Sequence, residues 1–428
     1  MSRAKPLHRR DWSRAIVLSG ALAGIAMPIY SAAQTPSPAL TTLYSFSGED
    51  GDGAGPYSAV TYSADGTLYG TTAYGGVFNS GTIFELTPPG PGGGAWTETV
   101  LHSFAGGNDG TYPYAGVVAG TGGVLYGTTN YGGAAGLGIV YELTPPIGQG
   151  GAWTETVLHS FSGSDGAYPY ANVTIGANGK LYGTTELGGT SNYGTVFELT
   201  PPAGSGGVWT ETVLYNFSGG SDGACPYAAL TTGSNGDFYS STVAGGSSDK
   251  GTVFRLALTK GGTWTETVLH SFTGSDGGFP YAGVTIGTNG ALYGTTAGSV
   301  NAGNGSAFEL SPPTGTGKPW TETVLHKFTG KSDGGAPHAA PSLGPSGSLY
   351  GTAFGGGTGN RFNGFGLLYQ LTPTGGGSWA ESVLYEFQGG NDGASPNAAL
   401  IPGPSGVFYG TTLGGGTLGQ GTVFAFTP

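Results

Sequence analysis

A short turn sequence, Asp-Gly-x-x-Pro, occurs seven times in this chain of 428 residues. Its copies begin at Asp52, Asp109, Asp165, Asp222, Asp276, Asp333 and Asp392, so the intervals between them are 57, 56, 57, 54, 57 and 59 residues. A period this regular indicates an array in which every copy is one structural unit that packs against its neighbours. The repeat therefore constrains the fold more than any other feature, and it leaves almost no length for a second domain.

Each unit contains four short segments rich in Val, Thr, Tyr and Phe. The motif Leu-Tyr-Gly-Thr-Thr, or a variant, places its third residue 18 positions after every turn aspartate, and Gly-Thr-Val-Phe-Glu-Leu-Thr follows it. A segment of the form Trp-Thr-Glu-Thr-Val-Leu-x-x-Phe, called the Trp segment below, then leads into the next turn. Clusters of Gly, Pro, Asn and Asp separate the segments, as is typical of β-strands joined by turns.

Four strands in each of seven units predict an all-β fold, a seven-bladed β-propeller with four antiparallel strands per blade. The two ends of the chain complement each other. Residues 41–46 match the last part of a Trp segment, whereas the chain stops at Gly-Thr-Val-Phe-Ala-Phe-Thr-Pro without making one. We therefore expect the N-terminal strand to pair with the C-terminal strand, which closes the ring and protects its sheet edges.

The order of strands within a blade follows from the size of the side chains. The strand after each turn, such as residues 170–176, is rich in small residues, and blades converge toward the axis. We expect this strand to be innermost and the Trp segment to be outermost. The reverse order remains an alternative.

Residues 1–33 have the form of a secretory signal peptide. Five basic residues precede an apolar run, and small residues follow at positions 31–33. The run contains Gly and Pro and is shorter than a membrane-spanning helix requires. We expect this segment to be removed, leaving residues 34–428 as a single propeller that is secreted or periplasmic, or associated with the cell surface.

Removal of that segment leaves a formal charge of about −16, which disfavours binding to nucleic acid or to an acidic membrane through a basic patch. We expect a monomer that does not insert into the membrane. The one cysteine, Cys225, has no partner for an internal disulfide. It is interpreted as a small, buried, apolar residue.

The units resemble the Gloeo/Verruco (GloVer) tandem repeat family of bacterial surface and secreted proteins. The resemblance rests on Leu-Tyr-Gly-Thr-Thr, Gly-Gly, Gly-Thr-Val-Phe and a following Ser-Phe-x-Gly, and it covers nearly all of residues 43–428. It implies a β-propeller-like repeat protein and no established activity. Members of such a family often end in an anchoring segment; this chain stops at Pro428 without one, so the expectation is free secretion or periplasmic residence.

Most acidic residues and four of the histidines occupy repeated positions, which argues for an architectural role. A catalytic acid and base need different environments, whereas equivalent positions in successive blades have similar ones. We therefore predict no catalytic residue, no metal site and no cofactor. The turn aspartates should accept hydrogen bonds from amides just downstream. Cation binding at residues 49–52 is the alternative.

The best candidates for ligand binding follow the turn proline. Five blades carry tyrosine there and the last two carry histidine and asparagine: Tyr57, Tyr114, Tyr170, Tyr227, Tyr281, His338 and Asn397. Aromatic rings with hydroxyl groups suit sugars or peptides because they offer apolar area and a polar tip together. We expect these residues on one face of the ring. The alternative is that the tyrosines only pack between blades.

The sixth unit breaks the repeat with a four-residue insertion, and departures of this kind are where a site can be added to a regular fold. Arg361 could hold a carboxylate or a sulfate, and Phe362 could stack beside it. We expect the insertion on the same face as the tyrosines. A solvated loop without a role is the alternative.

Three functions remain open at this stage. The first is a non-catalytic binding or surface-interaction module for an extracellular glycan or protein. The second is an exported enzyme, a lyase or hydrolase that acts on acidic polysaccharide through Arg361, His338 and a nearby tyrosine. The third is a structural protein of the cell envelope.

Overall fold

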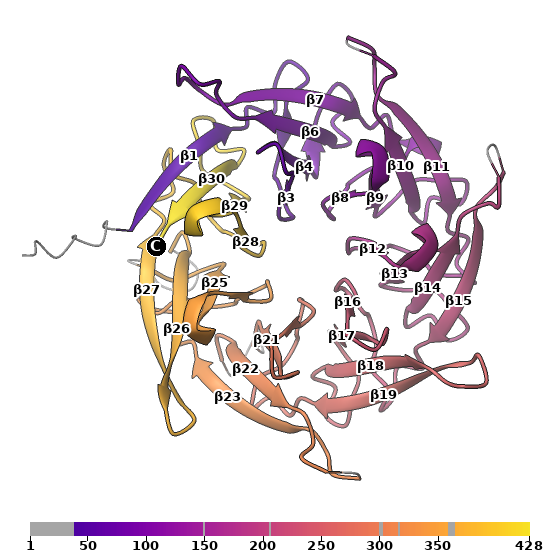
Figure 1. The fold of residues 1–428 in the computed structure, drawn as a ribbon, viewed down its shortest axis with the longest axis vertical. Coiled ribbons are helices and arrows are strands. Elements are labelled where there is room, and N and C mark those ends of the chain that lie inside the picture. The colour runs from indigo at the N-terminus through magenta and orange to yellow at the C-terminus, as the bar shows by residue number, and fades with distance from the viewer. Residues whose placement is uncertain (1–37, 149, 205–206, 299–302, 316, 358–363) are drawn as a thin grey trace, which may run out of the picture. The chain divides into compact units, whose positions relative to one another are not determined.

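Seven four-stranded antiparallel sheets surround a common axis and form the predicted seven-bladed β-propeller (Figure 1). The computed structural model describes residues 38–428 except 149, 205–206, 299–302, 316 and 358–363. Helical structure in these residues is limited to five 3₁₀ turns of three residues each. No helix in the described part of the chain has the length and apolar character needed to cross a bilayer.

The blades are numbered here along the chain, and each is given from its inner to its outer strand. Blades 1 to 3 are β3 (Thr61–Tyr62), β4 (Leu68–Thr72), β6 (Thr82–Thr87) and β7 (Thr97–Ser103); β8 (Val118–Ala119), β9 (Leu125–Thr129), β10 (Ile139–Thr144) and β11 (Thr154–Ser160); and β12 (Thr174–Ile175), β13 (Leu181–Thr185), β14 (Thr195–Thr200) and β15 (Thr210–Asn216). Blades 4 and 5 are β16 (Thr231–Thr232), β17 (Phe238–Thr242), β18 (Thr252–Leu258) and β19 (Trp264–Ser271); and β20 (Thr285–Ile286), β21 (Leu292–Thr296), β22 (Ser306–Ser311) and β23 (Thr321–Lys327). Blades 6 and 7 are β24 (Ser342–Leu343), β25 (Leu349–Ala353), β26 (Leu367–Gly375) and β27 (Ser378–Glu386); and β28 (Ile401–Pro402), β29 (Phe408–Thr412), β30 (Thr422–Thr427) and β1 (Ala39–Ser45).

The predicted closure of the ring is confirmed by the seventh blade. Its outer strand is β1, which pairs antiparallel with β30 from Ala39↔Thr427 to Ser45↔Thr422. The strand order is also confirmed, since the two-residue strands lie nearest the axis and the strands of the Trp segments form the perimeter (Figure 1).

The glycine of Leu-Tyr-Gly-Thr-Thr is required by the strand beside it. Gly70 pairs with Phe84, and a Cβ atom at Gly70 would lie within 2.4 Å of the Phe84 ring. The same close approach occurs in other blades, as between Gly183 and Phe197. The missing side chain therefore leaves room for the aromatic ring of the neighbouring strand in every blade except blade 4, which has Ser240 at this position.

The hydrophobic core lies between neighbouring blades. One cluster joins Ile83 of blade 1 to Leu125 and Tyr141 of blade 2, and another joins Val423 of blade 7 to Phe46 and Phe84. Phe46, Phe84 and Tyr141 are fully buried. Because each cluster draws on two blades, no blade can bury its apolar face alone.

Hydroxyl groups fasten each blade to the next near the axis. The first threonine of Leu-Tyr-Gly-Thr-Thr, or Ser241 in blade 4, donates to a main-chain carbonyl just before the inner strand of the following blade. The seven bonds are Thr71 to Ala115 (2.8 Å), Thr128 to Ala171 (3.1 Å), Thr184 to Ala228 (3.0 Å), Ser241 to Ala282 (2.7 Å), Thr295 to Ala339 (2.9 Å), Thr352 to Ala398 (3.0 Å) and Thr411 to Ser58 (2.9 Å). The last of these closes the circle from blade 7 to blade 1.

The turn aspartates hold the chain at the end of the outer strand. Asp165 accepts from the amide of Ser162 at 2.9 Å and from Nε2 of His159 at 3.0 Å, and Asp222 accepts from the Ser218 amide and the Tyr215 hydroxyl. The expectation of downstream amides is thus wrong for these two turns, where the bonded amides lie upstream because the turn folds back over the strand that precedes it. At Asp52 the downstream amide of Gly53 does donate, at 2.6 Å, beside the upstream amide of Ser47. Burial alone would raise the pKa of Asp165, but its hydrogen bonds and the neighbouring His159 together hold that pKa below its usual value.

Candidate functional site

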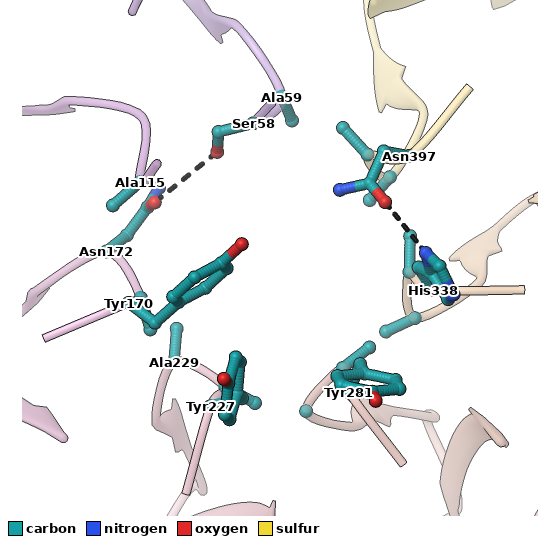
Figure 2. A pocket seen from close by; sticks show the side chains of 18 of the residues that line it. Ser58, Ala59, Ala115, Tyr170, Asn172, Tyr227, Ala229, Tyr281, His338 and Asn397 are labelled. Carbon is teal, nitrogen blue, oxygen red and sulfur yellow. Dashed lines mark hydrogen bonds between the residues drawn. The ribbon is translucent and has the colours of Figure 1, made fainter. Parts of the chain in front are cut away.

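A pocket of about 610 Å³ lies where the segments that precede the inner strands of all seven blades meet (Figure 2). Every blade contributes the residue that follows the turn proline. The structure therefore brings together all seven residues singled out at this position of the repeat, namely Tyr57, Tyr114, Tyr170, Tyr227, Tyr281, His338 and Asn397. Small residues, mainly alanine, line the rest of the pocket.

A fixed backbone conformation directs these side chains inward. The residue before each turn proline has a left-handed φ, between 50° for Ala336 and 63° for Gly55. The residue after the pocket position is then held by the threonine or serine of the preceding blade described above. Each pocket side chain therefore sits between a tight turn and a hydrogen-bonded carbonyl, which fixes its position before any ligand arrives.

The aromatic side chains contact one another around the pocket. The ring centroids are 4.9 Å apart for Tyr57 and Tyr114, 4.8 Å for Tyr114 and Tyr170, 4.6 Å for Tyr170 and Tyr227, 5.6 Å for Tyr227 and Tyr281, and 5.3 Å for Tyr281 and His338. The tyrosines thus pack between blades and line the pocket at the same time. Ligand binding and packing between blades, the two roles considered for these tyrosines, are therefore compatible.

His338 and Asn397 form the side of the pocket that lies across from Tyr170 and Tyr227 (Figure 2). Nδ1 of His338 lies 2.8 Å from Oδ1 of Asn397, and Nδ2 of Asn397 donates to the carbonyl of Tyr57 at 3.1 Å. The His338 ring also stacks on Phe354, 5.0 Å between centroids. Figure 2 shows Tyr170 and Tyr227 on one side of the pocket and His338 and Asn397 across from them. An aromatic wall therefore faces an imidazole and amide wall.

Burial keeps the tyrosine hydroxyls protonated. It raises the pKa of Tyr57, Tyr114, Tyr170 and Tyr227 above the usual value, with neighbouring tyrosines adding to the effect at Tyr114 and Tyr170. These hydroxyls therefore act as neutral hydrogen-bond donors and acceptors over the whole physiological pH range.

Four further polar residues line the pocket and were missed in the sequence: Ser58, Asn172, Thr231 and Thr285. Oδ1 of Asn172 accepts from the amide of Gly116 at 2.8 Å and lies 3.5 Å from the Ser58 hydroxyl, so it links three blades (Figure 2). The signal was present, because the other blades carry Ala or Gly at the position of Asn172. At this repeat position one blade has a polar residue and the others have small ones, so this part of the pocket wall differs from the rest.

A carboxyl group lies just behind the tyrosine wall. Burial raises the pKa of Glu186, which hydrogen bonds to the Tyr227 hydroxyl. Burial also raises the pKa of the nearby Cys225 thiol. The prediction for Cys225 is partly wrong: it is half-buried rather than buried, because its left-handed turn position leaves it at the surface of the blade.

Arg361 and Phe362 lie outside the described residues, so their expected place beside the tyrosines stays a prediction. Among the described residues, no group of three or more His, Cys, Asp or Glu side chains is arranged to hold a metal ion.

The fold resembles solved β-propellers of several kinds. A protein of Bacteroides uniformis, proposed to be a 6-phosphogluconolactonase, superposes with a TM-score of 0.50 at 16% identity, over 80% of this chain and 88% of that one. An ancestral GH74 enzyme superposes with a TM-score of 0.51 at 13% identity, over 90% of this chain but only 48% of that one, so this chain spans about half its length. At such low identity, both comparisons show the fold alone. No curated protein matches the sequence significantly.

The closed ring of seven blades and its axial pocket define a β-propeller built from tandem repeats. The Gloeobacter/Verrucomicrobia repeat matches the sequence over residues 29–232, 90–297 and 284–428. The chain belongs to this repeat family, as its motifs indicated.

Proposed function

We propose that the axial pocket binds an uncharged glycan and that the protein is a non-catalytic binding module. The observation that carries this proposal is the composition of the wall: five hydroxyl-bearing aromatic rings face an imidazole and amide pair within one pocket. Its volume of about 610 Å³ lies in the range of small-molecule sites.

Sugars combine the two properties that this wall matches. One face of a pyranose ring is apolar and stacks on an aromatic side chain, while its hydroxyl groups need donors and acceptors at the edge. The tyrosine hydroxyls, His338 and Asn397 offer those groups at fixed positions. A peptide would also need main-chain partners, and the carbonyls of Ala115, Ala171 and their counterparts each have one of two acceptor positions occupied by a hydroxyl of the preceding blade.

Catalysis on acidic polysaccharide is the rival function. It would require a cation to neutralise the substrate carboxylate and an acid and base pair with separated pKa values. The described residues that line the pocket include five tyrosines and one histidine as titratable groups, with no Asp, Glu, Lys or Arg. This lining suits a neutral ligand, which is why binding is preferred here.

The test begins with a glycan array that holds neutral and acidic polysaccharide fragments, followed by calorimetry on the best ligand. Tyr170→Ala should weaken binding at least tenfold, because it removes a ring that contacts three others. Tyr62→Ala is the matched control: it removes a tyrosine that stacks on Tyr409 between blades but lies outside the pocket. Equal losses in both variants would contradict the proposal. Release of products from uronic polysaccharide would support the enzyme instead.

Export of the protein is part of the same proposal. A glycan-binding module meets its ligand outside the cytoplasm, and residues 1–33 have the composition of a signal peptide. N-terminal sequencing of protein recovered from the medium or the periplasm tests this. A mature chain that begins near residue 34 supports export, whereas an intact chain retained in the cytoplasm contradicts it.

A further inference from the structure

Four additional tyrosines lie beside the pocket on blades 1 to 3. They are Tyr74, Tyr112, Tyr131 and Tyr168, called here the tyrosine platform. Tyr74 and Tyr131 are 41% and 43% exposed, and the other two are half-buried. A contiguous exposed aromatic surface on a monomeric protein is unusual and calls for a partner.

The platform is continuous with the pocket. The ring of Tyr112 stacks on that of Tyr114 in the pocket wall, with centroids 6.1 Å apart and planes at 25°. From Tyr112 the contacts continue to Tyr131 at 6.0 Å and from there to Tyr168 at 5.1 Å. Tyr74 contacts Tyr112 at 5.5 Å, and its hydroxyl lies 3.4 Å from that of Tyr114. An unbroken path of aromatic rings therefore leads from the axis outward.

Backbone pairing places the platform on the same side of the ring as the turns. The short strands β2 (Gly53–Ala54) and β5 (Tyr74–Gly75) pair in blade 1, and Thr111 bridges to Tyr131 in blade 2. The same bridge recurs at Ala224 and Ala244 in blade 4 and at Ala394 and Gly414 in blade 7. The loop after the second strand thus reaches the turn in each of these blades.

The platform is confined to one sector of the ring. At the position of Tyr74 and Tyr131, blade 3 carries Leu187, and blades 4 to 7 carry Ala244, Gly298, Gly355 and Gly414. Glycine or alanine at this position is therefore enough for the fold, and the fold does not require the tyrosines of blades 1 and 2.

Two platform residues stand where the backbone favours glycine. Tyr112 and Tyr168 have φ values of 57° and 58°, a left-handed conformation that is costly for a bulky residue. Blade 1 has Gly55 at the same position, with φ 63°. All seven blades share this conformation with different side chains, so the conformation belongs to the fold and the two tyrosines are not required by the turn.

We infer that the tyrosine platform extends the pocket and that the ligand is a linear, uncharged oligosaccharide rather than a single sugar. The end of the chain occupies the axial pocket, and the following sugar units stack across Tyr112, Tyr131 and Tyr168. This inference rests on the proposed function, since it assigns the same site a longer ligand. Aromatic rings with hydroxyl tips at successive positions provide each sugar unit with an apolar face and a polar edge.

The test compares short and long ligands in calorimetry. The probes are β-1,4-linked gluco-, manno- and xylo-oligosaccharides with two and six units. The six-unit member of the series that binds should bind at least tenfold more tightly than its two-unit member. Tyr131→Ala and Tyr112→Gly should abolish this advantage and leave the affinity for the two-unit sugar unchanged. Both changes copy residues found in sibling blades, Ala244 and Gly55, so the fold should tolerate them.

Phe279→Gly is the matched control. Phe279 is also left-handed, with φ 59°, but it lies in the turn that leads into blade 5, where its ring contacts Lys250 of blade 4, outside the sector of blades 1 to 3. The Phe279→Gly variant should leave the affinities for the two-unit and the six-unit sugar unchanged. Binding of the two-unit sugar without any gain from length overturns this inference alone. Absence of binding by every neutral glycan overturns the proposed function together with it, and an equal loss for short and long sugars in Tyr131→Ala also rejects the platform.

Discussion

The perimeter of the ring and its axis differ in how closely their residues repeat from blade to blade. At the perimeter the same side chains recur: most turn aspartates are hydrogen-bonded to a histidine or tyrosine of the outer strand, as in His102 with Asp109 and Tyr385 with Asp392. At the axis, one position carries tyrosine in five blades, then histidine and asparagine. Equal contacts between blades require equal residues, whereas a ligand without sevenfold symmetry requires unequal ones. Repetition therefore marks architecture here, and departure from it marks the candidate site.

The largest expected effect comes from removing one perimeter strand. A chain that begins at Ser47 lacks β1, which leaves β30 as an open edge and deletes the fully buried Phe46. We expect the loss of more than about 5 kcal/mol of unfolding free energy and therefore of the cooperative thermal transition. Circular dichroism melting measures this.

A chain that begins at residue 38 retains β1 and serves as the control, with melting like that of the longer chain. Adding a peptide of residues 38–46 to the truncated protein should restore the transition. Cooperative melting of the chain that begins at Ser47 would show that the perimeter strand does not close the ring.

Much of this fold was predictable because its strands are set by local patterns. The 18-residue offset between the turn and Leu-Tyr-Gly-Thr-Thr fixed the position of every unit, and the partial unit at residues 41–46 revealed the closure. Repeat position also placed the seven pocket residues, since equivalent positions in a ring must face the same axis.

Contacts between blades could not be predicted in the same way. The link from Asn172 to Ser58 and Gly116 and the contact of Tyr131 with Tyr168 depend on how neighbouring blades are tilted and staggered. No local pattern encodes that geometry. The sequence showed which repeat positions vary between blades. It did not show that variable positions of adjacent blades contact each other.

The second prediction concerns pH and again the perimeter. The glutamate of the Trp segment is half-buried, and it is close enough to feel the charge of the turn aspartate that begins the same repeat unit, as Glu98 does with Asp52. Burial, followed by the charge of that aspartate, raises the pKa of six such residues to about 7: Glu98, Glu155, Glu211, Glu266, Glu322 and Glu381. In the folded state these carboxyls hold protons that the unfolded chain has already lost above its ordinary pKa of 4.5.

Stability from these glutamates is therefore complete below pH 4.5 and is lost as the pH rises to about 7. Burial lowers the pKa of His159 and His326, so these two histidines favour stability at higher pH instead. The six glutamates outnumber them. Allowing for solvent screening of these half-exposed groups, we expect a melting temperature several degrees higher at pH 5 than at pH 8. Glu266→Gln should reduce that difference by roughly a sixth. A melting temperature that rises from pH 5 to pH 8 would refute the assignment.

A smaller effect is expected from a hydroxyl that joins two neighbouring blades near the axis. Thr128→Val keeps the shape of a buried side chain but leaves the carbonyl of Ala171, beside Tyr170, without its donor at 3.1 Å. We expect a loss of about 1–3 kcal/mol in urea unfolding. Thr144→Val is the control, because that hydroxyl bonds only to Glu142 within its own strand, and it should cost less than about 0.5 kcal/mol. Equal costs would mean that the axial hydroxyls do not fasten the blades.

The smallest effect tests whether a departure from the repeat can lie away from the site. Five blades place phenylalanine over the motif glycine or serine, but blades 2 and 6 have Tyr141 and Tyr369, which are fully buried and whose hydroxyls have no hydrogen-bond partner among the described residues. Tyr141→Phe removes an unsatisfied polar group and restores the consensus of its siblings, so we expect a gain of about 1 kcal/mol in urea unfolding, with ligand affinity unchanged. Tyr126→Phe is the comparison: its hydroxyl bonds to Glu142, so removal should give no gain. A loss of stability in Tyr141→Phe would mean that its hydroxyl is bonded within the core, and the departure at blade 2 would then be structural rather than a tolerated defect.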